Sequence, residues 1–134
     1  MDFSKLDTVK AAETTHKFAV LHPVTGEETG ALIDVYSAES NPVRHYASTV
    51  LRKLQKQEFD NNRSRKPKFK DLDELQEDAI EACIVRTAGW QNVQWDGKEL
   101  EFNEDNARKL LTACPWLREQ VIEHSDNLAN FLKA

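Results

Sequence analysis

Histidines are the first residues to test for chemistry, because they act as general bases and as metal ligands. The four histidines are His16, His22, His45 and His124, and none has a second ligand-type residue at the spacing of a metal site. His45 lies beside an apolar stripe, where a packed or solvated histidine is the expected role. The histidines therefore predict no metal centre.

Cysteines and paired carboxylates are the other residue types that could carry chemistry. Cys83 and Cys114 are too far apart for a CxxC pair and fall on predicted helix core positions, where free cysteine behaves as a small hydrophobe. Acidic residues such as Asp73 and Glu77 repeat four positions apart on a predicted helix, which favours a face that meets solvent or a basic partner. The sequence has no glycine-rich phosphate loop, GxSxG or HExxH motif. We expect no catalytic, cofactor-binding or metal-binding residue, and no enzyme.

Charge is distributed unevenly along the 134 residues, whose net charge is −5. Residues 1–40 carry three basic and seven acidic groups, a net charge of −4. Residues 41–70 carry nine basic and two acidic groups (+7), and residues 71–134 carry six basic and fourteen acidic groups (−8). A basic middle between acidic ends suits self-association or an oppositely charged protein partner. A solvated helix face followed by a charged loop is the alternative interpretation.

Basic residues of this middle segment are the main candidates for a protein-interaction site. They are Arg52, Lys56, Arg63, Arg65, Lys66 and Lys68. The basic run, with Phe69 inside it, could also contact phosphates and stack a base. The sequence pI of about 5.4 and the acidic segment that begins at Asp71 argue against this, so nucleic acid is an unlikely partner.

Composition indicates one globular domain spanning residues 1–134. Hydrophobic residues make up 40% and charged residues 31%, and no apolar run approaches the ~20 residues of a membrane span. The first residues lack the apolar core of a signal peptide, so we expect a cytoplasmic protein, intact as written, with no membrane partner.

The N-terminal half predicts a hairpin and one long helix. Residues 1–14 fit a mobile arm or a short helix, and residues 17–22 and 31–36 read as two strands joined by a turn. Asn41 is expected to cap a helix that runs to about Phe59, with Pro42 in its first turn. Residues 61–70 then form an exposed basic loop. The helix carries an apolar stripe that we expect to face the core: Val43, Tyr46, Ala47, Val50, Leu51 and Leu54.

The C-terminal half predicts further helices around a small turn. Asp71 caps a second long helix that ends at Gly89, and Asp96-Gly97 between alternating apolar residues indicates a hairpin or turn near 93–102. Asn103 caps another helix, Pro115 starts the next, and a last segment covers 128–132. The expected fold class is α+β and mainly α-helical, with an N-terminal β-hairpin followed by a bundle of about four to five helices.

Residues 86–132 carry an ordered series of short motifs. These are Gly89-Trp90, the Asp96-Gly97 turn, the helix start Phe102–Ala107, Pro115-Trp116-Leu117, Gln120-Val121-Ile122 and Asn130-Phe131-Leu132. In this order they resemble the tail assembly chaperones of long-tailed (siphovirus) bacteriophages, most closely those of lambdoid siphophages such as HK97. The upstream order of arm, hairpin and two helices fits the same family, with less distinctive motifs.

The resemblance implies a non-enzymatic role in the host cytoplasm. Such chaperones bind the long, helical tape measure protein, keep it soluble, recruit the tail tube protein, promote tube polymerisation and are absent from the mature virion. The family also implies a homo-multimer and a longer partner form made by ribosomal frameshifting. Trp116 and Phe131 read mainly as residues that build the fold, with direct partner contact as the alternative.

Two other classes stay open from the sequence. One is a structural virion component, such as a minor tail or connector protein. The other is a small nucleic-acid-binding regulator that uses the basic loop.

Overall fold

The computed structural model describes residues 1–132 and has the predicted α+β class. In chain order its elements are η1 (Phe3–Leu6), α1 (Thr8–Ala11), β1 (Thr15–Leu21), β2 (Glu28–Tyr36), α2 (Asn41–Arg63), α3 (Leu72–Arg86), β3 (Thr87–Gln91), β4 (Gln94–Trp95), β5 (Lys98–Glu99), α4 (Glu104–Ala113), α5 (Pro115–Asp126) and η2 (Leu128–Phe131). The predicted N-terminal hairpin is confirmed as β1 and β2, each longer than expected. The N-terminal segment forms two short helical turns, η1 and α1.

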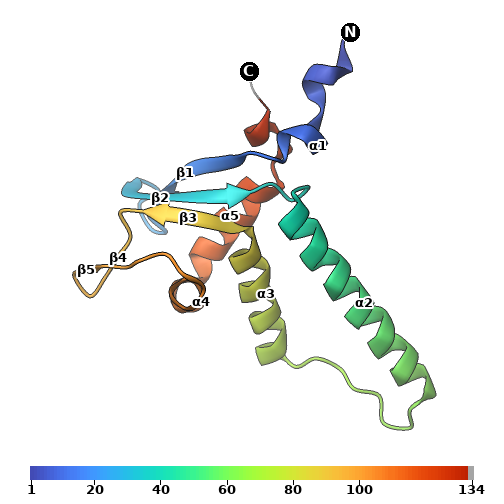
Figure 1. Ribbon diagram of the computed structural model, residues 1–134. Helices are drawn as coiled ribbons and strands as arrows, with labels where there is room; N and C mark the ends of the chain where they lie inside the picture. Colours follow the sequence, from blue (N-terminus) through green and yellow to red (C-terminus); the bar gives the residue numbers. More distant parts are fainter. Residues whose placement is uncertain (133–134) are drawn as a thin grey trace.

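The described residues include an antiparallel sheet with the order β1-β2-β3, covered on one face by α5, against which α4 packs in turn (Figure 1). Phe18 pairs with Ile33, and Ile33 pairs with Trp90, so these three side chains point to the same face. The alternation of side chains along β1 and β2 puts Phe18, Val20, Ile33 and Val35 into the core. The sheet thereby supplies one wall of the hydrophobic core.

Strand β3 corrects the prediction that a single helix runs from Asp71 to Gly89. Helix α3 ends at Arg86, and residues 87–91 pair with β2. Thr87 marks the change: its hydroxyl donates to the carbonyl of Cys83 at 2.8 Å while its backbone joins the sheet. A long-range pairing with the free edge of β2 overrides the local helical pattern here.

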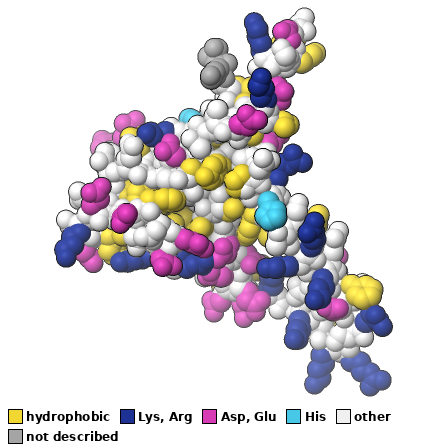
Figure 2. All heavy atoms as spheres, in the orientation of Figure 1, with side chains coloured by type: hydrophobic (Ala, Val, Ile, Leu, Met, Phe, Trp, Pro, Cys, Tyr) yellow, Lys and Arg dark blue, Asp and Glu magenta, His cyan; other side chains and the backbone are white. Residues whose placement is uncertain are grey.

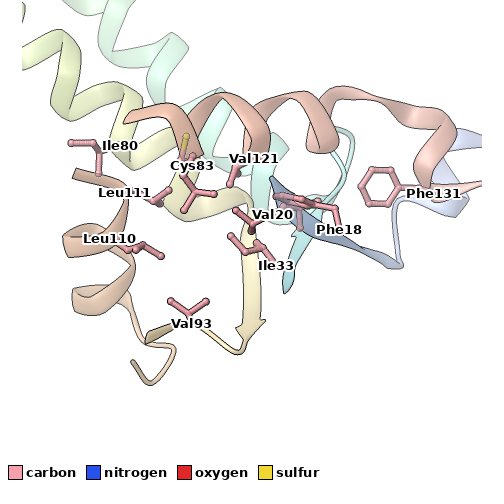
Figure 3. Packing of buried hydrophobic residues seen from close by; sticks show 12 residues of the cluster. Phe18, Val20, Ile33, Ile80, Cys83, Val93, Leu110, Leu111, Val121 and Phe131 are labelled. Atoms are coloured by element: carbon pink, nitrogen blue, oxygen red, sulfur yellow. The ribbon is translucent and has the colours of Figure 1, made fainter. Parts of the chain in front are cut away.

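The core lies between the sheet and the helices α3, α4 and α5 (Figure 3). Cys83 from α3, Leu111 from α4 and Val121 from α5 are each at most 2% exposed. Ser125 on α5 donates its hydroxyl to the carbonyl of Tyr36 at 2.7 Å, which fixes the helix against β2. These contacts position the two surfaces described below.

The turn and the helix caps of the C-terminal half are confirmed. Asp96 (φ 52°) and Gly97 (φ 75°) both adopt the left-handed conformation, as a two-residue turn between β4 and β5 requires. The side chains of Asp71 and Asn103 accept hydrogen bonds from the third residues of α3 and α4, and Pro115 stands in the first turn of α5.

Helix α2 departs from the prediction at both ends and along its face. Its N-cap is Ser40 rather than Asn41, and the helix continues past Phe59 to Arg63. Of α2, which the structure describes in full, Val43 alone is buried. The predicted apolar stripe is therefore mostly uncovered, because α2 leaves the body of the protein instead of packing along it (Figure 1).

The end of edge strand β1 is covered by a side chain. Gln120 accepts from the backbone N–H of Leu21 at 3.0 Å and donates to the carbonyl of the same residue at 2.9 Å. The glutamine amide thus occupies both hydrogen-bonding groups that Leu21 presents.

Candidate protein-interaction surface

Helix α2, the loop that follows it and the exposed first turns of α3 form an arm that projects from the body of the protein. At 1.5 Å per residue the 23 residues of α2 extend roughly 34 Å. Its main packing partner is α3, and the chain reverses between the two helices at the distal end of the arm (Figure 1). With one buried residue, α2 leaves most of its side chains exposed to other molecules.

An apolar strip runs along the middle of α2. We use this name for Val50, Leu51 and Leu54, which are 42%, 53% and 49% exposed. Val50 and Leu54 follow Val43 at helical spacing (i, i+7, i+11), so they continue the side of the helix that is buried near the sheet. The strip thus extends the contact face of Val43, which is buried near the sheet, along the exposed part of the helix.

A basic tip forms the distal end of the arm. We define it as residues 52–70, which hold eight basic and two acidic side chains, net +6: Arg52, Lys53, Lys56, Arg63, Arg65, Lys66, Lys68 and Lys70 against Glu58 and Asp60. Figure 2 shows the Lys and Arg side chains gathered over this end of the molecule. The six basic residues selected from the sequence are all exposed on this part of the arm.

One face of α2 within the tip combines charge with an aromatic ring. Arg52, Lys56 and Arg63 share that face by helical spacing, and Phe59 lies among them. The Arg63 guanidinium lies 5.3 Å from the centroid of the Phe59 ring, and Phe59 is 58% exposed. Phe69, in the following loop, is 80% exposed.

Asn61 holds the loop of the basic tip in place. Its side-chain amide donates to the carbonyl of Lys68 at 2.7 Å, and its amide oxygen accepts from the backbone N–H of Lys68 at 2.9 Å. Gln57 donates to the same carbonyl at 3.1 Å. The three hydrogen bonds fold the loop back onto α2, so the basic side chains of the tip have a defined arrangement.

Acidic residues of α3 are engaged within the chain. The ammonium of Lys70 bonds Asp78, and this hydrogen bond raises the pKa of Lys70. Arg108 of α4 bridges both Glu77 and Glu81. The acidic face that the sequence assigned to solvent or to a basic partner thus finds basic partners inside the molecule.

Trp116 and Phe131, the two aromatic candidates, lie away from the arm. Phe131 is 5% exposed and contacts His16 edge-on, with 5.9 Å between the ring centroids. Its ring belongs to the core, so it is not accessible to a partner in this fold. Trp116 is half-buried and lines a groove beside the core, together with Trp95.

Sequence reasoning missed Asn61 and Arg108. An asparagine after a helix is usually read as a helix end, and nothing local shows that it pairs with Lys68 seven residues later. Arg108 stood in a predicted amphipathic helix, and its two partners lie on another helix. Both roles depend on tertiary placement, which a one-sequence pattern does not contain.

Residues with nucleophilic or metal-binding character do not gather at one place in residues 1–132. Burial raises the pKa of the Cys83 thiol to about 11, which disfavours the reactive thiolate. Among these described residues no three His, Cys, Asp or Glu side chains lie together as metal ligands would. The distinctive surface of the described chain is the arm.

Comparison with known protein families adds a phage origin. A family model described as "YdaY prophage protein" matches residues 37–134, from just before α2 to the end of the chain. The chain belongs to this prophage protein family. The match includes the whole arm and both tryptophans of the groove, whereas β1, β2 and the groove residues that these strands supply lie outside it.

Other comparisons gave no relative. Neither the curated proteins nor the solved structures contained a match to the chain. None of the helices in the described residues is both long and apolar enough to span a bilayer.

Proposed function

We propose that this prophage protein is a tail assembly chaperone of a long-tailed phage. It acts without enzymatic chemistry in the host cytoplasm, binds the tape measure protein, keeps it soluble and recruits tail tube protein around it. It leaves before the virion matures and works with further copies of itself and with a frameshifted longer form. The phage family membership and the series of motifs in residues 86–132 support this proposal.

The observation that carries the proposal is the exposed apolar strip on α2. A tape measure protein is long and helical, and before assembly its helices expose apolar stripes that would aggregate. Val50, Leu51 and Leu54 offer a matching stripe on an accessible helix, which suits side-by-side helix contact. The adjacent basic tip would favour a client segment that carries acidic residues.

The strip contributes a measurable part of the client affinity. Full burial of a Val or Leu side chain stabilises by about 1.5–3 kcal/mol, and about half of each strip side chain is already covered. Covering the exposed halves of all three is worth about 2–4 kcal/mol, or about 30- to 1,000-fold in affinity.

Replacement of the strip tests the proposal. Val50→Gln, Leu51→Gln and Leu54→Gln together retain good helix formers and remove the apolar contact. Co-expressed with the tape measure protein of the same prophage, the natural chain should hold the client in the soluble fraction, and the triple variant should lose most of it. A matched control replaces Leu6, Val9 and Val24, which are 46%, 60% and 86% exposed elsewhere, by glutamine.

A different set of results would support the other classes. Equal client solubility with the strip variant and the natural chain would contradict the proposal. Detection of the chain in purified particles would favour a virion component, such as a minor tail or connector protein. A salt-sensitive gel shift at low protein concentration would favour the nucleic-acid-binding regulator.

A further inference from the structure

The two ends of the molecule carry opposite charge. The basic tip has a net charge of +6, and the turn of β4 and β5 lies on the far side of the sheet from it (Figure 1). Residues 27–28 and 94–109 lie around that turn, and we call their charged side chains the acidic end. It leaves out Arg108, which pairs with glutamates of α3. It contains seven carboxylates and two lysines: Glu27, Glu28, Asp96, Glu99, Glu101, Glu104 and Asp105, with Lys98 and Lys109. None of the seven takes part in an ion pair among the described residues.

An apolar groove opens at this acidic end. Its volume is about 620 Å³, and its lining includes Ile33, Val93, Trp95, Leu110, Trp116 and Leu117. Trp95 and Trp116 are half-buried and line the groove, and the ammonium of Lys109 lies 5.2 Å from the centroid of the Trp95 ring. A groove of this kind suits an aromatic side chain.

Carboxylates of the acidic end lie next to the residues that line the groove and give its rim negative charge. Glu28 precedes Thr29 and Gly30, which line the groove, and Asp96 follows Trp95. Glu99 is the cross-strand partner of Gln94, which also lines it. A ligand that fits this site therefore combines an exposed aromatic ring with surrounding positive charge.

The basic tip of this chain has that combination. Phe69 is 80% exposed and stands between Lys68 and Lys70, and the Asn61 hydrogen bonds hold this loop in a fixed shape. The acidic face of α3 is a poorer partner for the tip, because Arg108 and Lys70 already form ion pairs with three of its carboxylates. The carboxylates at the groove are free of such partners in the described structure.

We propose that copies of this chain associate head to tail, with the Phe69 loop of one copy docked in the tryptophan-lined groove of the next. The two contact surfaces are different and lie at opposite ends of one molecule. Such a heterologous contact adds copies without closing a dimer, so it produces an open row. The inference extends the proposed function, since a row of copies would place successive apolar strips along one elongated client.

Light scattering behind size-exclusion chromatography, without client, tests the association. The mass of the natural chain should rise above 15.4 kDa with concentration and fall as salt screens the charge pairs. A tip variant, Arg65→Glu, Lys66→Glu and Lys68→Glu, should weaken association at least about tenfold and keep its circular dichroism. A control with the same charge change is Lys5→Glu, Lys10→Glu and Arg44→Glu.

A groove variant, alone and mixed with the tip variant, tests whether the tip of one copy binds the groove of the next. The groove variant is Glu28→Lys, Asp96→Asn and Glu99→Lys, in which asparagine tolerates the positive φ of position 96. Each variant alone should be monomeric. An equimolar mixture should give dimers of twice the chain mass and nothing longer, because one working tip and one working groove remain. Phe69→Ala should weaken association, and Phe3→Ala, which removes another exposed aromatic ring, should not.

Three results would overturn the inference: a natural chain that is monomeric at every concentration, tip and groove variants that associate like the natural chain, or a mixture that stays monomeric. The strip variant separates this inference from the proposed function. Its self-association should match that of the natural chain while its client solubility is lost. The tip variant should lose self-association. If it still keeps the client soluble, both proposals are supported, and self-association and client binding use different surfaces.

Discussion

Substitution of Asn61 by alanine tests whether the loop of the basic tip is folded onto α2. The change removes both hydrogen bonds between the Asn61 side chain and the backbone of Lys68. Hydrogen bonds contribute about 0.5–1.5 kcal/mol each, and both members of this pair are exposed, which favours the lower part of that range, so opening the loop should cost about 1–2 kcal/mol less. That is roughly 5- to 30-fold in the opening equilibrium.

Amide hydrogen exchange by NMR measures this opening at one atom. The Lys68 N–H, which donates to Asn61 in the natural chain, should exchange roughly 5- to 30-fold faster in Asn61→Ala. Asn62→Ala is the matched control, because the side chain of Asn62 has no such contact in the described structure, and its Lys68 exchange should stay unchanged. Equal exchange at Lys68 in the natural chain and in Asn61→Ala would refute the arrangement of the tip.

Three further predictions concern the body of the protein. Leu111→Ala should lower the free energy of unfolding by about 2–5 kcal/mol in a denaturant titration, because Leu111 is 2% exposed in the core. Leu72→Ala, at a position that is 69% exposed, should change it by less than about 1 kcal/mol. Equal losses in the two variants would contradict the core assignment. Burial lowers the pKa of His124 below its ordinary 6.5, so the folded state favours the neutral ring. Its contribution to stability should be complete above pH 6.5 and be lost as pH falls from there through the lowered pKa, so the urea midpoint of the natural chain should fall more over this range than that of His124→Phe; parallel pH profiles would contradict the assignment. Arg108→Gln should remove the salt dependence of stability that its bridge to two glutamates of α3 contributes, so unfolding midpoints at low and high salt should lie closer together than in the natural chain.

Local signals in the sequence were sufficient for the elements that short-range chemistry decides. Asp96-Gly97 predicted the turn because both positions need positive φ, and Asn103 and Asp71 predicted helix starts because their side chains accept from the first free N–H groups. Each of these features is complete within a few residues. The structure reproduces them at the expected positions.

Features that depend on partners distant in the chain could not be predicted from the sequence. Residues 87–89 were predicted as the end of a helix, and the pairing of residues 87–91 with β2 depends on a segment that is distant in the sequence. The stripe of Val50 and Leu54 has the periodicity of a buried face, yet the described chain leaves about half of each side chain exposed. An apolar stripe reports that a helix face is suited to contact, and it does not report whether the contact is within the chain or with another molecule.

The side chain of Gln120 determines which kinds of assembly the sheet permits. Because its amide occupies both backbone groups of Leu21, an incoming strand would have to displace two hydrogen bonds before it could pair at that end of β1. Free strand edges are the usual route to uncontrolled aggregation. The association proposed above would use the arm and the groove, while this part of the sheet edge stays closed to strand exchange.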